Sequence, residues 1–499
     1  MNHITVLFNQ SKGTINPNIY GHFSEHIGGV FYDGLWVGED SPVENIRGFR
    51  KALVEKFAAI HPPVLRWPGG CFAETYDWRD GIGPRDKRPR RVNWWYYLDK
   101  RPETNQVGTH EFVDFCRMTG AEPYFAANMT SVPPLHIRDW IEYCNMPEGT
   151  TTLADERARN GSPEPFNIRY WGIGNENHGG GGRMNAEYYA RGFLRYSTVC
   201  ENIPGEKTLV ACGPFAHNIQ WTRELMSVLR GKGVTPQAIS VHYYCRTPDW
   251  PQDFTEEGWY ALLHGANYMQ NIIDDQRAAM DEFDPERKTM LYVDEWGSWH
   301  KDGSGPSKGY NLFEQQSSIR DAMVTALTLN IFNNRCDVVG MANVAQLCNN
   351  LHCLFLAHEE NFLCTPTYHV FNMFKTHQGA KQLCVDSDCG SFDGGEAFHQ
   401  AARPLDRVSV SASESADNAV TITLANTSMT DPIRISLGAL GGELDGQAEI
   451  TTLCSADPHA CNTFEAPEAV TPATENREFH TGDALTLPAA SVTCVRVKK

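Results

Sequence analysis

Two carboxylates in this sequence stand at the ends of apolar stretches, where a charge requires an explanation. Glu176 closes the stretch YWGIGNE, and Glu295 closes the stretch LYVDE. A charge at the end of a buried strand must be paired or functional, so each residue taken alone can be interpreted as one partner of a strand-end ion pair. The presence of both favours another interpretation, in which the two carboxyl groups act together on one substrate.

Two carboxyl groups placed across one scissile bond are what the hydrolysis of a glycosidic bond requires. They lie about 5 Å apart when one of them is a nucleophile, and farther apart when it activates a water molecule. Sequence spacing fixes neither distance, so both stereochemical outcomes remain open at this level.

Further polar residues close other candidate strands. In a (β/α)₈ barrel the active site is built at the C-terminal ends of the strands, so we expect these side chains to converge on the carboxylate pair. They are Glu25, His26, Arg66, Asn128, Asn175, His242, Tyr244, Asn343 and Gln346.

The elements that must position these residues alternate along the first part of the chain. Short β-branched or aromatic runs are separated by longer stretches of helical character, which is typical of parallel strands with helical crossovers. Eight such runs are present, and eight strands close a barrel, so we predict an α/β fold with a (β/α)₈ TIM barrel. The candidate strands span residues 18–25, 63–68, 122–128, 168–176, 208–213, 238–244, 289–295 and 338–346.

The pattern changes beyond about residue 380. Segments such as RVSVSAS, AVTITLAN and PIRISLG alternate apolar and polar positions between turn residues, which indicates an antiparallel β-sandwich. The first strand, HITVLFN, can add to it. We therefore predict an N-terminal strand that joins the sandwich (1–16), a catalytic barrel (17–384) and a C-terminal β-sandwich (385–499).

Composition excludes several classes of protein. The chain has 499 residues, 41% of them apolar, and a formal net charge of −18, which repels a nucleic-acid backbone. No signal sequence or membrane span is evident, so we expect a cytoplasmic protein with no membrane partner. The fifteen cysteines lack regular CxxC pairs, which suits reduced thiols. Cys384 and Cys389 come nearest to a pair, but no His lies close by in metal-ligand spacing, so no metal is expected.

Seven segments together resemble a known family. The sequence is similar to α-L-arabinofuranosidases of glycoside hydrolase family 51, a retaining family of the clan A barrels, from about residue 15 to 380. This resemblance implies an exo-acting enzyme that releases terminal α-L-arabinofuranosyl groups from arabinose-containing oligosaccharides, needs no cofactor, and forms a homo-oligomer, often a hexamer. The segments are NIYGHFSEHIGG, LRWPGGCFAETYDWRDGIGPRDKRP, YWGIGNEN, SVHYY, LYVDEWGSWH, MANVAQL and TPTYHVFNMFKTHQ.

The resemblance also assigns roles to the residues that carry the chemistry. It makes Glu176 of GNE the acid/base and Glu295 of VDEW the nucleophile. Glu176 must hold a proton, so we expect burial and the neighbouring carboxylate to raise its pKa. Arg66 matches a residue that hydrogen-bonds the nucleophile and favours its charged form, and Asn175 matches a donor to the sugar 2-OH. Structural roles remain the alternative: a salt bridge for Arg66, and a strand-end cap for Asn175.

Other matched residues are expected to bind the sugar or to support the site. Glu25 and Gln346 resemble acceptors for sugar hydroxyls, with structural pairing as the alternative. Tyr244 matches a tyrosine beside the nucleophile. His242 lies on the same strand face, because residues i and i+2 point the same way, and is expected to support the site unless it is a packed barrel histidine.

Aromatic residues and two departures bear on substrate recognition. Trp299, and Trp94 or Trp95, could form hydrophobic walls against sugar faces, although a tryptophan is more often part of a core. Cys71 stands where the family often has Asn, and a thiol is a weaker hydrogen-bond partner. His178 stands where related sequences often have Trp, and the glycines after it predict a flexible loop.

Two other functions are compatible with the same residues. One is a retaining glycosidase of the same clan that acts on another furanoside or on an internal glucan or xylan bond. The other is a non-catalytic carbohydrate-binding barrel, since a fold alone does not imply activity. The run GGGG is not followed by GK[ST], which argues against a nucleotide-binding P-loop.

Overall fold

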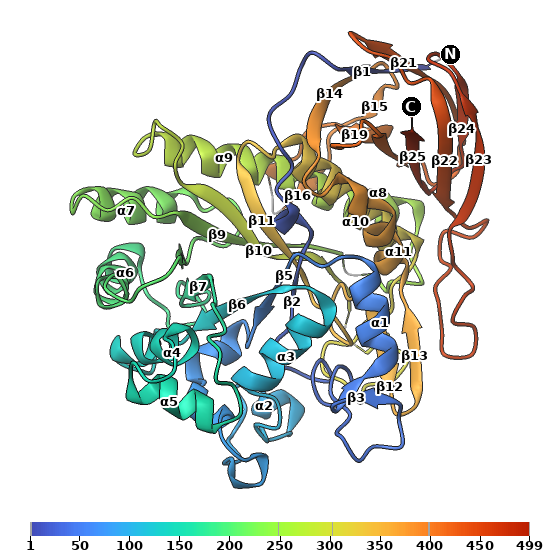
Figure 1. Cartoon of the computed structure of the whole chain (residues 1–499). Coiled ribbons are helices and arrows are strands. Elements are labelled where there is room, and N and C mark those ends of the chain that lie inside the picture. Colours follow the sequence, from blue (N-terminus) through green and yellow to red (C-terminus); the bar gives the residue numbers. More distant parts are fainter. Residues whose placement is uncertain (1, 248, 302, 398–399, 499) are drawn as a thin grey trace. The chain divides into compact units, whose positions relative to one another are not determined.

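A computed structural model describes residues 2–247, 249–301, 303–397 and 400–498 (Figure 1). The chain divides into two compact units. One unit comprises Gly21–His242 and Asp274–Glu295, and the other comprises Met1–Tyr20, Tyr243–Ile273 and Trp296–Lys499. Among the described residues, no helix is both long and apolar enough to cross a membrane.

Eight strands close a parallel barrel in the order β10, β11, β2, β5, β6, β7, β8, β9. Each strand falls on one of the eight predicted segments, so the predicted barrel is confirmed. Its strands are β2 (Gly21–Phe23), β5 (Val64–Trp67), β6 (Glu122–Ala127), β7 (Tyr170–Ile173), β8 (Thr208–Ala211), β9 (Ala238–Arg246), β10 (Met290–Trp299) and β11 (Val339–Ala345).

Strand limits differ from the prediction in a few places. Pro17–Tyr20 forms a 3-10 turn, η1, because proline fixes φ near the helical value and donates no backbone hydrogen bond. Strand β2 therefore begins only at Gly21. Strands β9 and β10 continue past the predicted ends, to Arg246 and Trp299.

The crossover helices follow the strands. Helix α6 is typical: the side chain of its N-cap Asn185 accepts a hydrogen bond from the backbone N–H of Tyr188, and such caps stabilise a helix by about 1 kcal/mol. The helices are α1 (Lys51–Ala59), α2 (Tyr96–Asp99), α3 (Thr109–Thr119), α4 (Leu135–Asn145), α5 (Thr152–Arg159), α6 (Ala186–Cys200), α7 (Ile219–Arg230), α8 (Glu256–Asn267), α9 (Met269–Asp281), α10 (Ile319–Asn334) and α11 (Pro366–Phe374).

An aromatic cluster joins strands β5 to β7 with helices α3 and α4. The ring of Trp67 stacks on Phe112 at 4.9 Å, and Phe125 stacks on Trp140 at 4.7 Å. Trp171 meets Phe125 edge-on at 5.2 Å. All five rings are buried, and burying a side chain of this size contributes about 1.5–3 kcal/mol. This packing fixes the strands whose C-terminal ends carry the candidate site.

The second unit contains a nine-stranded, mostly antiparallel sheet that surrounds one core. Strand β1 pairs in parallel with β21 and antiparallel with β14. Apolar side chains from strands throughout the sheet form a single buried cluster, as the two faces of a sandwich would. The strands are β1 (Asn2–Leu7), β14 (Lys381–Ser387), β19 (Val408–Glu414), β20 (Val420–Asn426), β21 (Ile433–Leu440), β22 (Gly446–Leu453), β23 (Ala473–Phe479), β24 (Ala484–Leu487) and β25 (Ser491–Lys498).

Helix α10 packs on this sheet and is buried along nearly its whole length. Its polar side chains bond to the sheet: Asn330 donates to Ser409 Oγ at 3.2 Å, and Asn333 donates to Ser411 Oγ at 3.1 Å. The remaining strands form short two-stranded pairs: β3 (Asn45–Ile46) with β4 (Phe49–Arg50), β12 (Phe355–His358) with β13 (Asn361–Cys364), β15 (Ser391–Phe392) with β18 (Leu405–Asp406), and β16 (Glu396–Ala397) with β17 (Gln400–Ala401).

Candidate active site

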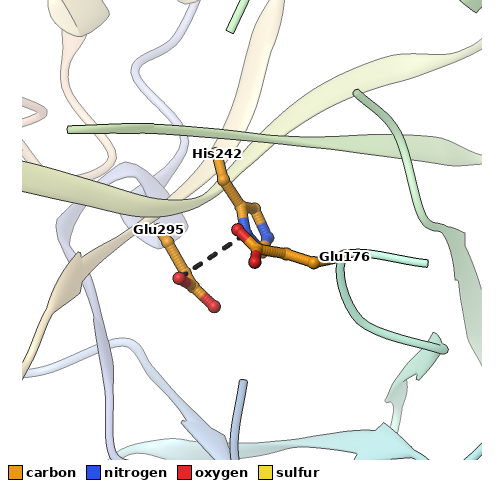
Figure 2. A group of neighbouring side chains, drawn as sticks. All are labelled: Glu176, His242 and Glu295. Carbon is orange, nitrogen blue, oxygen red and sulfur yellow. Dashed lines mark hydrogen bonds and ion pairs between the residues drawn. The ribbon is translucent and has the colours of Figure 1, made fainter. Parts of the chain in front are cut away.

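Glu176, which follows β7, lies together with His242 of β9 and Glu295 of β10 (Figure 2). His242 Nδ1 is 3.0 Å from Glu176 Oε1 and 3.5 Å from Glu295 Oε2. One ring nitrogen of His242 and one carboxylate oxygen from each glutamate all lie within 4.8 Å of one another. The spacing fits a pair in which one carboxylate is a nucleophile, and it is shorter than the roughly 6.5–9.5 Å of an inverting pair.

Arg66 lies on the other side of Glu295. Its Nη1 donates to Glu295 Oε1 at 2.9 Å, and its Nη2 donates to Asn175 Oδ1 at 2.6 Å. Its Nε is 3.9 Å from Asp294 Oδ2. Burial alone would lower the pKa of Arg66, but the charges of Glu295 and Asp294 outweigh burial and raise it. Arg66 is therefore a permanent buried cation that donates a hydrogen bond to the Glu295 carboxylate.

The protonation of Glu176 departs from the prediction. Burial alone would raise its pKa, but the hydrogen bond and charge of His242 outweigh burial and leave that pKa below its usual range. Burial would lower the pKa of His242, but the charges of Glu295 and Glu176 raise it. The predicted increase in the Glu176 pKa is therefore wrong, because the effect of the neighbouring His242 imidazole is larger than that of burial.

Asn175 offers an amide donor to the site. Its Oδ1 is occupied by Arg66, while its buried Nδ2 has no hydrogen-bond partner among the described residues. A buried donor without a partner destabilises the fold by about 1–3 kcal/mol, so this N–H group is suited to a ligand hydroxyl. The predicted contact with a sugar 2-OH is compatible with this geometry and remains a prediction.

Glu25 accepts hydrogen bonds from two donors and is buried near the charges of Glu295 and Arg66. Its Oε1 accepts from the backbone N–H of Phe72 at 2.9 Å and from Trp95 Nε1 at 3.0 Å. Burial, and then the charge of Glu295, raise the pKa of Glu25 to about 7. A Cβ on Gly70 would lie 2.7 Å from Glu25 Oε2, so the second glycine of the PGG motif is required for this approach.

Glu74 was not identified by the sequence reasoning, although it is fully buried and next to the site. Its carboxylate accepts hydrogen bonds from the backbone of Asn175 and from the side chain of Asn177, the two neighbours of Glu176. The rule that a buried charge must be paired or functional could have indicated it. Burial was not apparent, however, because Glu74 lies in a turn, η2 (Cys71–Thr75), rather than in a strand.

Cys71 faces the loop that follows the candidate acid/base. A Cβ on Gly180 would lie 2.8 Å from Cys71 Sγ. Burial raises the pKa of Cys71 far above its ordinary value, which keeps the thiol neutral. The role of Cys71 in substrate binding remains a prediction.

The glycine-rich loop after Glu176 is folded into a hydrogen-bonded turn, and the flexibility expected from its composition stays a prediction. The backbone N–H of Gly179 donates to the carbonyl of Glu176 at 2.7 Å, and that of Met184 donates to the carbonyl of Asn177 at 2.7 Å. The ring of His178 meets Trp221 edge-on at 5.5 Å. Glycine permits this tight path, because a Cβ on Gly181 would lie 1.6 Å from the carbonyl oxygen of Asn175.

Tyr244, Trp299 and Gln346 belong to the other compact unit and are described within it. The rings of Tyr244 and Trp299 meet edge-on at 5.4 Å, and the Arg246 guanidinium lies 4.1 Å from the Trp299 ring centroid. Gln346 is buried, directly after β11. The roles expected for these three residues in sugar binding remain predictions.

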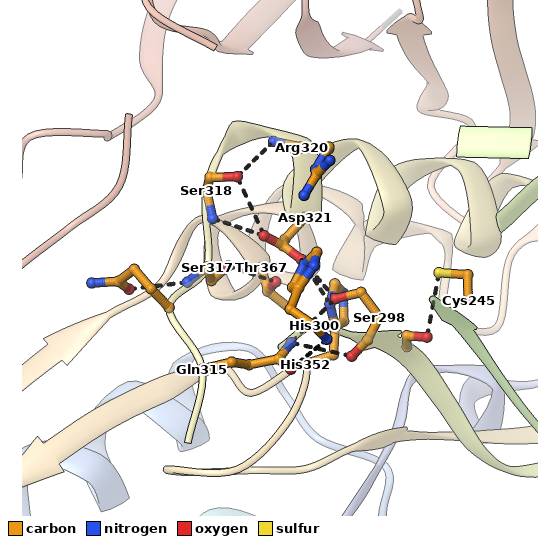
Figure 3. Close-up of polar contacts among 12 residues, drawn as sticks. Cys245, Ser298, His300, Gln315, Ser317, Ser318, Arg320, Asp321, His352 and Thr367 are labelled. Carbon is orange, nitrogen blue, oxygen red and sulfur yellow. Dashed lines mark hydrogen bonds and ion pairs between the residues drawn. The ribbon is translucent and has the colours of Figure 1, made fainter. Parts of the chain in front are cut away.

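The two neighbours of Trp299 in the sequence, Ser298 and His300, belong to a buried polar network (Figure 3). Asp321 Oδ1 accepts from Ser298 Oγ at 2.6 Å and lies 2.7 Å from His300 Nε2. The ring of His352 lies 2.8 Å from Ser298 Oγ. Burial would raise the pKa of Asp321, but the two histidines hold it well below its usual value. These contacts anchor the residues before and after Trp299.

Three other polar strand-end residues were expected to converge on the carboxylate pair. His26 pairs with Glu103 at 2.9 Å and accepts from Trp67 Nε1 at 2.9 Å. Asn128 donates to the carbonyl of Tyr76 at 3.2 Å and to a neighbouring serine. These contacts favour structural roles for His26 and Asn128. Asn343 is buried in β11, in the other unit.

Glu176, His242 and Glu295 are also close enough to one another to hold a metal ion. The Arg66 guanidinium, however, already donates to Glu295 at 2.9 Å, and a permanent cation at that carboxylate disfavours a divalent ion. The donor set therefore fits proton transfer and nucleophilic attack better than metal binding.

Comparison with known proteins adds an independent line of evidence. Residues 56–258 match the family model described as "Alpha-L-arabinofuranosidase 1 domain", and residues 294–491 match "Alpha-L-arabinofuranosidase C-terminal domain". The chain is 36% identical to the "Intracellular exo-alpha-L-arabinofuranosidase" of Bacteroides ovatus, over 94% of this chain and 90% of that protein.

Solved structures agree with these matches. The crystal structure of the GH51 arabinofuranosidase from Xanthomonas axonopodis pv. citri superposes with a TM-score of 0.92 at 33% identity and covers 100% of both chains. The arabinose complex of the α-L-arabinofuranosidase from Thermotoga maritima superposes with a TM-score of 0.89 at 29% identity, again over 100% of both chains.

Proposed function

Because this chain belongs to the α-L-arabinofuranosidases of glycoside hydrolase family 51, we propose that it is an exo-acting α-L-arabinofuranosidase. It releases terminal non-reducing α-L-arabinofuranosyl groups by double displacement, with retention of configuration. The observation that carries this proposal is the spacing of Glu176, His242 and Glu295, whose polar atoms lie within 4.8 Å of one another. That distance suits a nucleophile and an acid/base on one glycosidic bond.

In the first step, the Glu295 carboxylate attacks the anomeric carbon and the glycosidic oxygen leaves with a proton from Glu176. Arg66 holds the Glu295 carboxylate in place through its 2.9 Å hydrogen bond. His242 Nδ1 lies 3.0 Å from Glu176 Oε1, so a proton carried on this nitrogen can replace the one that Glu176 gives to the leaving group. The products of this step are the free alcohol and a glycosyl ester of Glu295.

In the second step, Glu176 acts as the base. It removes a proton from water as the water oxygen attacks the anomeric carbon, and the bond to Glu295 breaks. Arabinose is released, Glu295 is again a carboxylate, and Glu176 or His242 retains the proton. The second inversion at the same carbon restores the original configuration.

Binding of the furanose ring depends on acceptors and donors around this pair. Glu25 and Asn175 supply an acceptor and a donor in the unit that holds the two catalytic glutamates. Cys71, Tyr244, Trp299 and Gln346 are proposed to complete sugar binding, and His242 and Arg66 to support the catalytic pair.

Location, assembly and domain limits are proposals of the same kind. We propose that the enzyme acts inside the cell on arabinose-containing oligosaccharides, a location supported by the name of the Bacteroides ovatus relative, which is called intracellular. A homo-oligomer, of hexamer size by resemblance to the family, is proposed and can be tested by light scattering after gel filtration. The proposed domain limits are 1–16, 17–384 and 385–499.

A panel of 4-nitrophenyl furanosides and pyranosides tests the activity. We expect hydrolysis of the α-L-arabinofuranoside, with the Glu295→Ala variant as the inactive control. Proton NMR of the first-formed product in methanol should show the methyl glycoside in the α configuration. Preference for another glycoside, or an inverted first product, would contradict the proposal.

A further inference from the structure

We propose that Glu74 is a positioning residue that holds the acid/base Glu176 in its working orientation. This inference rests on the proposed function, because it concerns the role of Glu176 in glycosidic bond cleavage. Glu74 lies in turn η2 (Cys71–Thr75), which follows β5, and its side chain is fully buried. It acts through the residues on either side of Glu176, so it is not itself a catalytic residue.

The carboxylate of Glu74 is surrounded by N–H donors. Oε1 accepts from the backbone N–H of Asn175 at 2.6 Å and from Asn177 Nδ2 at 2.8 Å. Oε2 accepts from the backbone N–H groups of Met129 at 2.9 Å and Thr130 at 2.8 Å. One side chain therefore ties the segment after β6 to the residues immediately before and after Glu176.

Glu176 needs such support because its backbone is strained. It has a φ of +43°, and a residue with a Cβ rarely adopts this left-handed conformation unless the surrounding structure enforces it. Asn177 helps to close the turn by donating to the carbonyl of Gly181 at 2.6 Å. Both neighbours of Glu176 are therefore fixed, and the direction of its side chain follows from theirs.

Only an ionised glutamate satisfies this set of donors. A carboxylate has two oxygens and about four acceptor positions, whereas glutamine has one oxygen and adds an N–H₂ group. In a Glu74→Gln variant, one pair of donors would face another donor. Aspartate would keep the charge but could not reach both segments, because its side chain is one methylene shorter.

The same turn also holds the sugar-binding carboxylate. The backbone N–H of Phe72, two residues before Glu74, donates to Glu25 Oε1 at 2.9 Å. Turn η2 thus fixes Glu25 with a main-chain donor and the Glu176 turn with a side-chain acceptor. A substitution of the Glu74 side chain leaves the main-chain donor to Glu25 in place and removes only the acceptor of the Glu176 turn.

The test compares two leaving groups in the Glu74→Gln variant. With a 2,4-dinitrophenyl α-L-arabinofuranoside, which needs little protonation, kcat/KM should stay within about threefold of the parent, while with an alkyl α-L-arabinofuranoside it should fall by about 100-fold. The matched control is Glu111→Gln. Glu111 also accepts a backbone N–H, that of Gly108 at 2.9 Å, but its partners include no site residue, so both rates should stay near those of the parent.

Each outcome distinguishes a positioning role of Glu74 from a purely structural one. An equal fall on both substrates, or no fall on either, would overturn the proposal, because a purely structural role does not distinguish leaving groups. If the Glu74→Gln variant does not fold, Asn177→Ala, which removes one of the four donors, should show the same direction of selectivity. An unchanged ratio in that variant would overturn the proposal. A parent enzyme inactive on both arabinofuranosides would instead refute the proposed function.

Discussion

Replacing Glu25 by glutamine should change stability and activity in a pH-dependent way. Glu25 is buried, and burial together with the charge of Glu295 raises its pKa from the ordinary 4.5 to about 7. Its carboxyl group therefore binds a proton more tightly in the folded than in the unfolded chain. The stability that this contributes is present at low pH and is lost as the pH rises through about 7.

The size of the effect follows from the two pKa values. One pKa unit corresponds to about 1.4 kcal/mol, so the full difference between 4.5 and about 7 is about 3 kcal/mol. About 2.5 kcal/mol of this falls between pH 5 and pH 8. Glutamine does not titrate, so Glu25→Gln should gain about this much relative to the parent when the pH is raised from 5 to 8.

Urea unfolding of both proteins at pH 5 and pH 8 measures this difference. The exposed Glu201→Gln variant controls for the loss of one negative charge. A stability difference between parent and Glu25→Gln that is the same at both pH values would refute the reasoning. Activity gives a second readout: the KM of the parent for an arabinofuranoside should rise as the pH falls below about 7, because protonated Glu25 is a poorer acceptor, and the variant should lack this dependence.

Two further variants test other parts of the site. Arg66→Met should lower kcat/KM by about 100-fold or more and the unfolding free energy by about 3–5 kcal/mol, because it leaves the buried carboxylates of Glu295 and Asp294 without their cation. Steady-state kinetics and urea unfolding measure the two effects, and an unchanged rate would contradict the role of Arg66. Asp321→Asn should shift the fluorescence emission of Trp299 and lower the free energy of unfolding by about 3 kcal/mol, because it removes the charge that anchors His300. An unchanged spectrum would show that the polar network around Asp321 does not position Trp299.

Much of the fold could be predicted because the barrel follows from simple patterns. Each barrel strand contains a short apolar run, and polar residues such as Glu176 and Glu295 follow several of these runs in the sequence. The C-terminal ends of parallel strands share one face of the barrel, so strand-end residues such as Arg66 and Asn175 were expected to lie near the carboxylates, and they do.

The remaining features depend on contacts that sequence spacing does not encode. Glu74 lies in a turn, and its burial becomes evident only once four donors from distant segments surround it. The pKa of Glu176 depends on whether an imidazole or a carboxylate lies nearer, which is a matter of side-chain placement. Among the glycines after His178, Gly181 is needed because a side chain there would collide with the carbonyl of Asn175, a contact that the composition of the loop does not indicate.

The central claim is that Glu295 is the nucleophile and Glu176 the acid/base. The most direct test is the anomeric configuration, by proton NMR, of the glycosyl azide that each alanine variant forms from an activated aryl arabinofuranoside. Glu176→Ala should accumulate the covalent intermediate, because its hydrolysis lacks the base, and azide should restore turnover and give a product of retained configuration. Rescue of Glu176→Ala with inverted product, and of Glu295→Ala with retained product, would show that the two roles are exchanged.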